Sequence, residues 1–171
     1  MIHLEEAVVR KLKTVQHVLC TVESCTGGQI ANLITNVAGA SEVYWGSFIT
    51  YDNSAKEELG VPRSLLLEHG AVSAQTAQSL AEQGLKKLME NPYRKDSLSL
   101  LKPRGFVCVA TTGIAGPSGG STEKPIGLCY IGLAVSGRKT QIEVFQASAQ
   151  DRIGIKAQFS EKTLELIRGS F

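Results

Sequence analysis

The chain has 171 residues, 43% hydrophobic and 20% charged, which is enough for one domain with a sizeable core and too few to predict two. The net charge is +2, and no run of lysine or arginine accompanies the few aromatic residues, so nothing indicates a nucleic-acid partner. Because no apolar segment approaches the roughly 20 residues that cross a bilayer, we expect a cytoplasmic protein without a membrane partner. We further expect a single domain over 1–171, a small-molecule partner and a homo-oligomer.

Helical and strand-like patterns alternate in the first part of the chain. Apolar residues at helical spacing predict a helix over 4–14, and the apolar run 17–22 predicts a buried strand. Helical spacing returns over 27–36, so the letters ESCTGG occupy a strand-to-helix turn. A second strand is expected over 44–51, followed by a short capped helix over 52–60.

The second part continues the alternation. A long amphipathic helix is predicted over 73–90, with its first serine as the N-cap, and a buried strand over 106–113. Two strands, 128–135 and 140–147, form a hairpin, and a last helix follows over 151–168. The side chains expected on the buried face of that helix are Ile153, Ala157, Leu164 and Ile167.

Residues 91–104 interrupt this pattern. They contain two prolines and four basic side chains without sustained periodicity, which predicts a surface loop or insertion with no chemistry of its own.

The elements together predict an α/β fold: a single three-layer domain with a mixed β-sheet and helices on both faces. In such folds ligands collect at the carboxyl ends of the strands. Three polar or glycine-rich segments follow predicted strands here, with the letters ESCTGG, YDNSAK and TTGIAGPSGG. The four cysteines have no CxxC spacing and no nearby histidine, so we expect buried free thiols and no metal site.

Ser24 lies in the first of these segments. A serine at a sharp strand-to-helix turn, followed by Gly27 and Gly28, can expose its hydroxyl near backbone N–H groups, as in a nucleophile elbow, although the GxSxG pattern is absent. Two alternatives remain open from the residues alone. Ser24 or Thr26 could simply cap the helix, and Cys25 is a competing nucleophile.

A serine nucleophile needs a base, and no histidine is obviously placed to act as one. Lys56 is the candidate for a pairing of the Ser-Lys type. Its ordinary pKa of roughly 10.4 would have to fall by about three units, which corresponds to about 4 kcal/mol and requires burial or a neighbouring cation. The alternative is a solvated side chain. Tyr51, at the end of the preceding strand, could hydrogen-bond to this pair or simply pack.

The segment TTGIAGPSGGSTEKPIG carries hydroxyls, including that of Thr112, and five glycines whose backbone amides could wrap an oxyanion or a phosphate. The glycines assigned to this role are Gly113, Gly116, Gly119 and Gly120. It matches neither dinucleotide-binding nor Walker patterns, and a long turn between strands is the alternative. Arg152, at the start of the last helix, could hold an anionic ligand or form an ion pair at the rim.

Seven blocks of letters occur in the order and spacing found in one family. ESCTGG, GAS, YDNSAK, LGV, HGAVS, TGIAGPSGGSTEKPIG and a late DR resemble the CinA C-terminal domain family over roughly 5–168. Several members of that family are nicotinamide-nucleotide amidases. The resemblance implies an α/β enzyme of pyridine nucleotide salvage, which converts nicotinamide mononucleotide (NMN) and water to nicotinate mononucleotide and ammonia without a metal or organic cofactor.

The same resemblance assigns site residues. Those that match family positions are Ser24, Lys56, Tyr51, Thr112 and Arg152. Ser24 would be the nucleophile and Lys56 its base, Tyr51 and Thr112 would line the site, and Arg152 would hold the substrate's phosphate. Gln150 replaces a glycine that is usual before the DR pair.

From these assignments we predict an acyl-enzyme mechanism. The oxyanion is expected on backbone amides near Thr26, Gly27 and Thr112 or Gly113, with Gly28 in the same substrate-binding turn. The alternative function is a non-catalytic nucleotide-binding or protein-interaction domain linked to competence or DNA damage.

Overall fold

The computed structural model describes residues 3–91 and 103–171. In chain order its elements are α1 (Leu4–Val15), β1 (His17–Glu23), α2 (Gln29–Thr35), the 3-10 turn η1 (Ala40–Glu42), β2 (Tyr44–Ile49), α3 (Asn53–Leu59), α4 (Arg63–His69), α5 (Ala74–Glu90), β3 (Gly105–Gly113), β4 (Leu128–Val135), β5 (Gln141–Gln146) and α6 (Arg152–Gly169).

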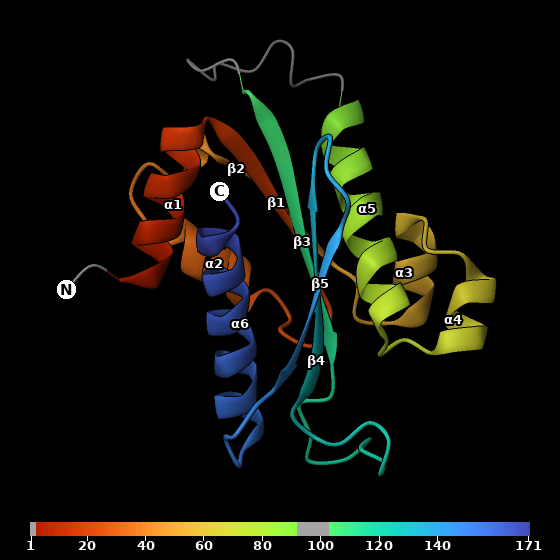
Figure 1. The fold of residues 1–171 in the computed structure, drawn as a ribbon. Coiled ribbons are helices and arrows are strands. Elements are labelled where there is room, and N and C mark those ends of the chain that lie inside the picture. The colour runs from red at the N-terminus through yellow and green to blue at the C-terminus, as the bar shows by residue number, and fades with distance from the viewer. Residues whose placement is uncertain (1–2, 92–102) are drawn as a thin grey trace.

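The strands form one mixed sheet in the order β2-β1-β3-β4-β5. β1 pairs in parallel with both β2 and β3, whereas β4 pairs antiparallel with β3 and β5. Helices α1, α2 and α6 lie on one face, and α5 lies on the other together with α3 and α4 (Figure 1). The predicted α/β fold with a mixed sheet and helices on both faces is therefore confirmed.

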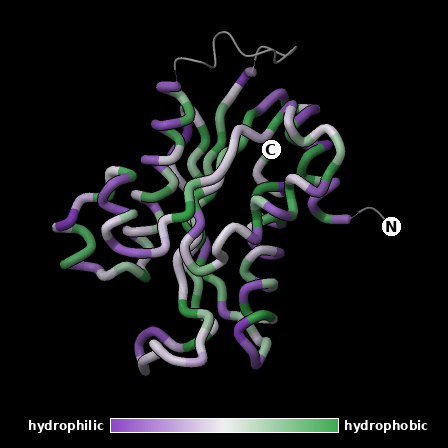
Figure 2. Tube along the Cα trace, turned by 180° about the vertical axis from the view of Figure 1, so that it is seen from behind, coloured by the Kyte–Doolittle hydropathy of each residue, from purple (hydrophilic) through white to green (hydrophobic). Residues whose placement is uncertain are grey.

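Each face of the sheet has its own hydrophobic core. Leu19 and Val107 point toward α1 and α6, and their neighbours Cys20 and Cys108 point toward α5. Because the central strands are covered on both faces, they read as continuous apolar runs, whereas the helices alternate between polar and apolar residues (Figure 2). Helix α5 lies so close to β4 that a Cβ at Gly132 would collide with a backbone carbonyl of the helix.

Several local predictions are confirmed. Ser73 caps α5, accepting a hydrogen bond from the Thr76 N–H at 3.1 Å, and Gly60 ends α3 in the left-handed conformation. All four cysteines are free and buried.

Among the described residues no helix is both long and apolar enough to cross a membrane.

Other predictions are wrong or lie outside the described residues. On α6, Ile153 is 78% exposed and Ala157 is exposed too, because the helix is rotated to bury Ile155 and Phe159 beside the predicted Leu164 and Ile167. Helix α4 forms in a stretch where no element was predicted. Of the predicted surface insertion 91–104, residues 92–102 lie outside the described part of the chain.

Candidate active site

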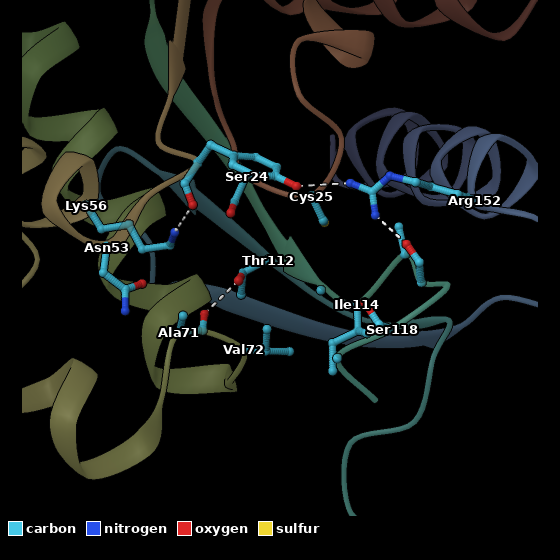
Figure 3. A pocket seen from close by; sticks show the side chains of 15 residues that line it. Ser24, Cys25, Asn53, Lys56, Ala71, Val72, Thr112, Ile114, Ser118 and Arg152 are labelled. Carbon is cyan, nitrogen blue, oxygen red and sulfur yellow. Dashed lines mark hydrogen bonds between the residues drawn. The ribbon is translucent and has the colours of Figure 1, made fainter. Parts of the chain in front are cut away.

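A pocket of about 270 Å³ lies at the carboxyl ends of β1 and β3. Five segments line it: the turn after β1, the stretch from the end of β2 into α3, the loop before α5, the glycine-rich segment after β3, and the start of α6 (Figure 3). The lining residues are Ser24, Cys25, Tyr51, Asn53, Lys56, Ala71, Val72, Thr112, Gly113, Ile114, Ala115, Gly116, Ser118, Gly119 and Arg152. The three segments singled out from the sequence thus meet at one site.

Ser24 presents a free hydroxyl to this pocket. Its backbone N–H donates to the Thr111 carbonyl at 3.2 Å, which extends the pairing of β1 with β3 by one residue. Its hydroxyl hydrogen-bonds to no other residue that the structure describes, and it points into the pocket in Figure 3. Helix α2 begins only at Gln29, so neither Ser24 nor Thr26 is its cap. The Thr26 hydroxyl instead pairs with that of Thr111 at 2.9 Å.

The cap of α2 comes from Glu23, which is completely buried at the end of β1. Its carboxylate accepts hydrogen bonds from the backbone N–H groups of Gly28 at 2.9 Å, Ile30 at 3.1 Å and Ala31 at 2.8 Å. These are donors that a helix start otherwise leaves unsatisfied. The sequence gives no signal for this role, because a glutamate after an apolar run is typical of the polar end of a strand.

Lys56 is 1% exposed, so the alternative of a solvated side chain is excluded. Its amine donates to the backbone carbonyls of Thr50 at 2.8 Å and Tyr51 at 3.1 Å. Burial lowers the pKa of this amine and outweighs Asp52 and Cys25, whose charges act in the opposite direction. In Figure 3 the amine and the Ser24 hydroxyl point into the same part of the pocket, although no hydrogen bond joins them in the described structure.

Arg152 forms the opposite side of the site. Its guanidinium donates to the Tyr51 hydroxyl at 3.0 Å and to the backbone carbonyl of Gly116, so it joins the end of β2 to the glycine-rich segment. The Tyr51 hydroxyl therefore contacts Arg152, and only the backbone carbonyl of Tyr51 contacts Lys56. Gln150 is exposed and donates to the Ser148 carbonyl at 3.1 Å, outside the pocket lining.

The third wall is apolar. The Thr112 hydroxyl donates to the Ala71 carbonyl at 2.6 Å, which fixes the loop before α5 against the end of β3. Ala71, Val72 and Ile114 face the pocket beside it (Figure 3). Lys124 donates to the His69 carbonyl at 3.1 Å and so links the glycine-rich segment to the end of α4.

The structure separates the residues predicted to bind substrate into two groups. Gly113, Gly116 and Gly119 line the pocket, whereas Thr26, Gly27 and Gly28 line a separate depression together with Lys156 on α6. The Gly28 amide is already occupied by Glu23, so it offers nothing to an anion. Gly120 lies outside the lining of both pockets.

Seven lining residues were not among the predicted site residues, and one of them, Cys25, had been considered only as a competing nucleophile. The other six are Asn53, Ala71, Val72, Ile114, Ala115 and Ser118. Asn53 could have been found, because it stands three residues before Lys56 in a helix and so shares its face. Within the described ranges, no group of three or more histidine, cysteine or acidic side chains is arranged to hold a metal.

The chain is thus an α/β protein with a mixed sheet and a pocket at the ends of its parallel strands. An apolar wall with a few convergent polar groups at that position is the usual form of a small-molecule site in this class of fold. The model of the CinA C-terminal domain family matches residues 1–92 and 101–171 of the chain. The chain therefore belongs to this family.

Relatives and solved structures agree with that assignment. The chain is 42% identical over 167 residues to a competence-damage inducible protein of Caldicellulosiruptor bescii and 40% identical over 173 residues to a CinA-like protein of Chloroherpeton thalassium, in each case over 96% of this chain and 36% of that protein. The crystal structure of competence/damage inducible protein CihA from Agrobacterium tumefaciens matches with a TM-score of 0.80 at 34% identity, over 96% of this chain and 93% of that one. The chain thus spans about a third of the length of these curated relatives.

Proposed function

We propose that this chain is an amidohydrolase that deamidates NMN to nicotinate mononucleotide and ammonia. The observation that carries the proposal is the meeting of a serine with a free hydroxyl and a fully buried lysine in one pocket. A lysine acts as a general base only when it is neutral, and burial is one of the few ways to keep it so near neutral pH. The family, which includes amidases, supports the same reaction class.

The proposed reaction has two halves. The neutral Lys56 amine takes the Ser24 proton while Oγ attacks the carboxamide carbon, which forms a C–O bond and a tetrahedral oxyanion. Collapse of this intermediate breaks the C–N bond, and the Lys56 ammonium returns its proton to the departing nitrogen, which leaves as ammonia. Lys56 then deprotonates a water molecule that attacks the ester, and Ser24 regains its proton as the nicotinate product leaves.

The oxyanion needs backbone donors that nothing else occupies. The N–H of Cys25, the residue after the nucleophile, donates to no other residue in the described part of the chain. The residue after the nucleophile supplies such a donor in nucleophile elbows generally. We therefore assign the first oxyanion donor to Cys25, in place of the Thr26 and Gly27 amides expected from the sequence, and keep Gly113 as the second.

The remaining contacts suit a pyridine nucleotide. The apolar wall of Ala71, Val72 and Ile114 offers a surface for a flat ring. Arg152 has five N–H donors in a planar fork and uses only part of them on Tyr51 and Gly116, so donors remain for a phosphate.

The first test is ammonia release from NMN by the purified protein, with nicotinamide riboside as the phosphate-free control. The proposal expects release from NMN and a sharp fall without the phosphate. Detectable binding of NMN without ammonia release would contradict it and would favour the nucleotide-binding domain, a role that the competence and damage names of the relatives leave open.

A further inference from the structure

Helix α2 has no cap of its own. The residue in its cap position is Gly28, at φ 94°, and no side chain there accepts from the first turn. The Glu23 carboxylate takes over this role from five residues earlier in the chain: one of its oxygens accepts from the Gly28 and Ile30 amides and the other from the Ala31 amide. Glu23 is itself the last residue of β1, so its backbone leads directly into the turn 24–27. Its carboxylate binds the amides at the other end of the same turn, so one residue holds both ends.

The same residue also fixes the position of the base. The Glu23 carbonyl accepts from the Thr50 N–H at 2.9 Å, and the Thr50 carbonyl accepts from the Lys56 amine at 2.8 Å. The nucleophile turn and the lysine are therefore connected through Glu23 by a short series of hydrogen bonds. The Thr21 hydroxyl, 3.5 Å from the carboxylate, is the only other donor to it in the described structure.

We propose that Glu23 is a positioning residue for the deamidation, an inference that rests on the proposed function. By occupying the α2 amides it holds the turn so that the Ser24 hydroxyl faces the carboxamide carbon while the free Cys25 N–H faces the oxygen on that carbon. A displacement of about 1 Å at such a turn can cost about 100-fold in rate. Glu23 touches neither substrate nor reacting atoms, so its effect appears in kcat.

Glu23→Gln is the decisive variant. A carboxamide keeps one acceptor oxygen but turns the other into an NH2 donor, which then faces the N–H groups that the carboxylate bound. We expect kcat for NMN to fall about 100-fold, with KM changed less than about threefold and the acidic limb of the pH–rate profile unmoved, because Lys56 keeps its burial. A variant with kcat within threefold of wild type would overturn the proposal.

Two controls separate positioning from a general loss of stability. Glu161→Gln makes the same chemical change on the exposed side of α6, and Leu88→Ala opens the buried core at the far end of α5. Both should keep kcat within about twofold while folded. If Leu88→Ala lowered kcat as much as Glu23→Gln at equal loss of stability, the positioning role would be excluded.

Labelling of Ser24 by a fluorophosphonate distinguishes the two levels of inference. If the wild-type protein is labelled but releases no ammonia from NMN, the proposed function fails, while slower labelling of Glu23→Gln still supports positioning and equal labelling overturns it. Should Glu23→Gln not fold, amide hydrogen exchange in the wild-type protein decides. Protection of Ile30 and Ala31 with rapid exchange at Cys25 is expected, and rapid exchange at all three contradicts the proposal.

Discussion

Two seven-residue helices follow neighbouring parallel strands, and each belongs to one half of the candidate dyad. Helix α3, which carries Lys56, is capped in the ordinary way by the exposed Asp52, whose carboxylate accepts from the Ser54 N–H at 2.8 Å. Helix α2, which follows Ser24, is capped by the buried Glu23 from within the strand. Under the proposed mechanism the difference has a simple meaning. The base is held by its own burial and follows an ordinary local cap, whereas the nucleophile lies in a turn that a buried side chain holds from the strand.

The largest effect is expected at the nucleophile turn. Ser24→Ala should lower kcat by about 10⁴-fold or more, since removal of a nucleophile disables the whole catalytic unit. The free energy of unfolding should change by less than about 0.5 kcal/mol, because the hydroxyl bonds to no other described residue. Ammonia release and chemical denaturation measure the two quantities. Activity that survives Ser24→Ala but disappears in Cys25→Ala would transfer the nucleophile to the thiol.

The second-largest effect is expected at Lys56, the other member of the candidate Ser-Lys pair. Lys56→Met should lower kcat by about 10²- to 10⁴-fold, the usual contribution of a general base. In the wild-type protein the rate should rise with pH through the lowered pKa of Lys56, because only the neutral amine accepts a proton. A profile without that acidic limb would contradict its role as base.

The pH dependence of the free energy of unfolding tests the lowered pKa of Lys56 independently of activity. Because the pKa of Lys56 is lower in the folded than in the unfolded chain, the unfolded chain binds more protons between the lowered pKa and the ordinary lysine pKa of 10.5. The free energy of unfolding of the wild-type protein therefore rises with pH in that window. Lys56→Met should remove this rise, as urea denaturation at several pH values would measure.

Arg152 tests the link between the end of β2 and the glycine-rich segment. Arg152→Ala should lower kcat/KM for NMN by about ten- to 100-fold, through the loss of charge-assisted hydrogen bonds to the phosphate. Nicotinamide riboside, which has no phosphate, should be turned over at an unchanged rate. An equal loss with both substrates would assign Arg152 to holding Tyr51 and Gly116 only.

The smallest effect is expected at the exposed cap. Asp52→Asn keeps a good N-cap but removes a negative charge that raises the pKa of Lys56. The pKa of the lysine should fall further, so the acidic limb of the pH–rate profile should move to lower pH with kcat at its plateau unchanged. A shift to higher pH would contradict the assignment of that limb to Lys56.

Most of the fold could be predicted because its signals are local. The apolar run of β1 and the caps Asp52, Gly60 and Ser73 are readable within a few residues. The buried face of α6 could not be placed, because apolar residues occur on several sides of that helix and only packing chooses Ile155 over Ile153. Helix α4 had a usable signal in Pro62 before it and Gly70 after it.

The site was predictable in its main polar residues, but not in its apolar wall or in its contacts. Ser24, Lys56, Thr112 and Arg152 do line one pocket. Gly28 was predicted to bind substrate, but its amide is occupied by the side chain of Glu23 from the strand. The spacing of residues in the sequence does not indicate a helix cap that comes from the preceding strand. Such a contact depends on the turn closing in three dimensions, which periodicity does not describe.

The burial of Lys56 has a consequence for how sequences of this kind change over time. A fully buried amine with a lowered pKa is harder to accommodate than an apolar side chain of similar length, so selection for thermal stability alone would replace it. Random substitution at this position would yield many folded chains, several of them with a higher free energy of unfolding. A lysine that persists there among descendants therefore reports selection for its chemistry, and its replacement would mark the lineages in which that chemistry was abandoned.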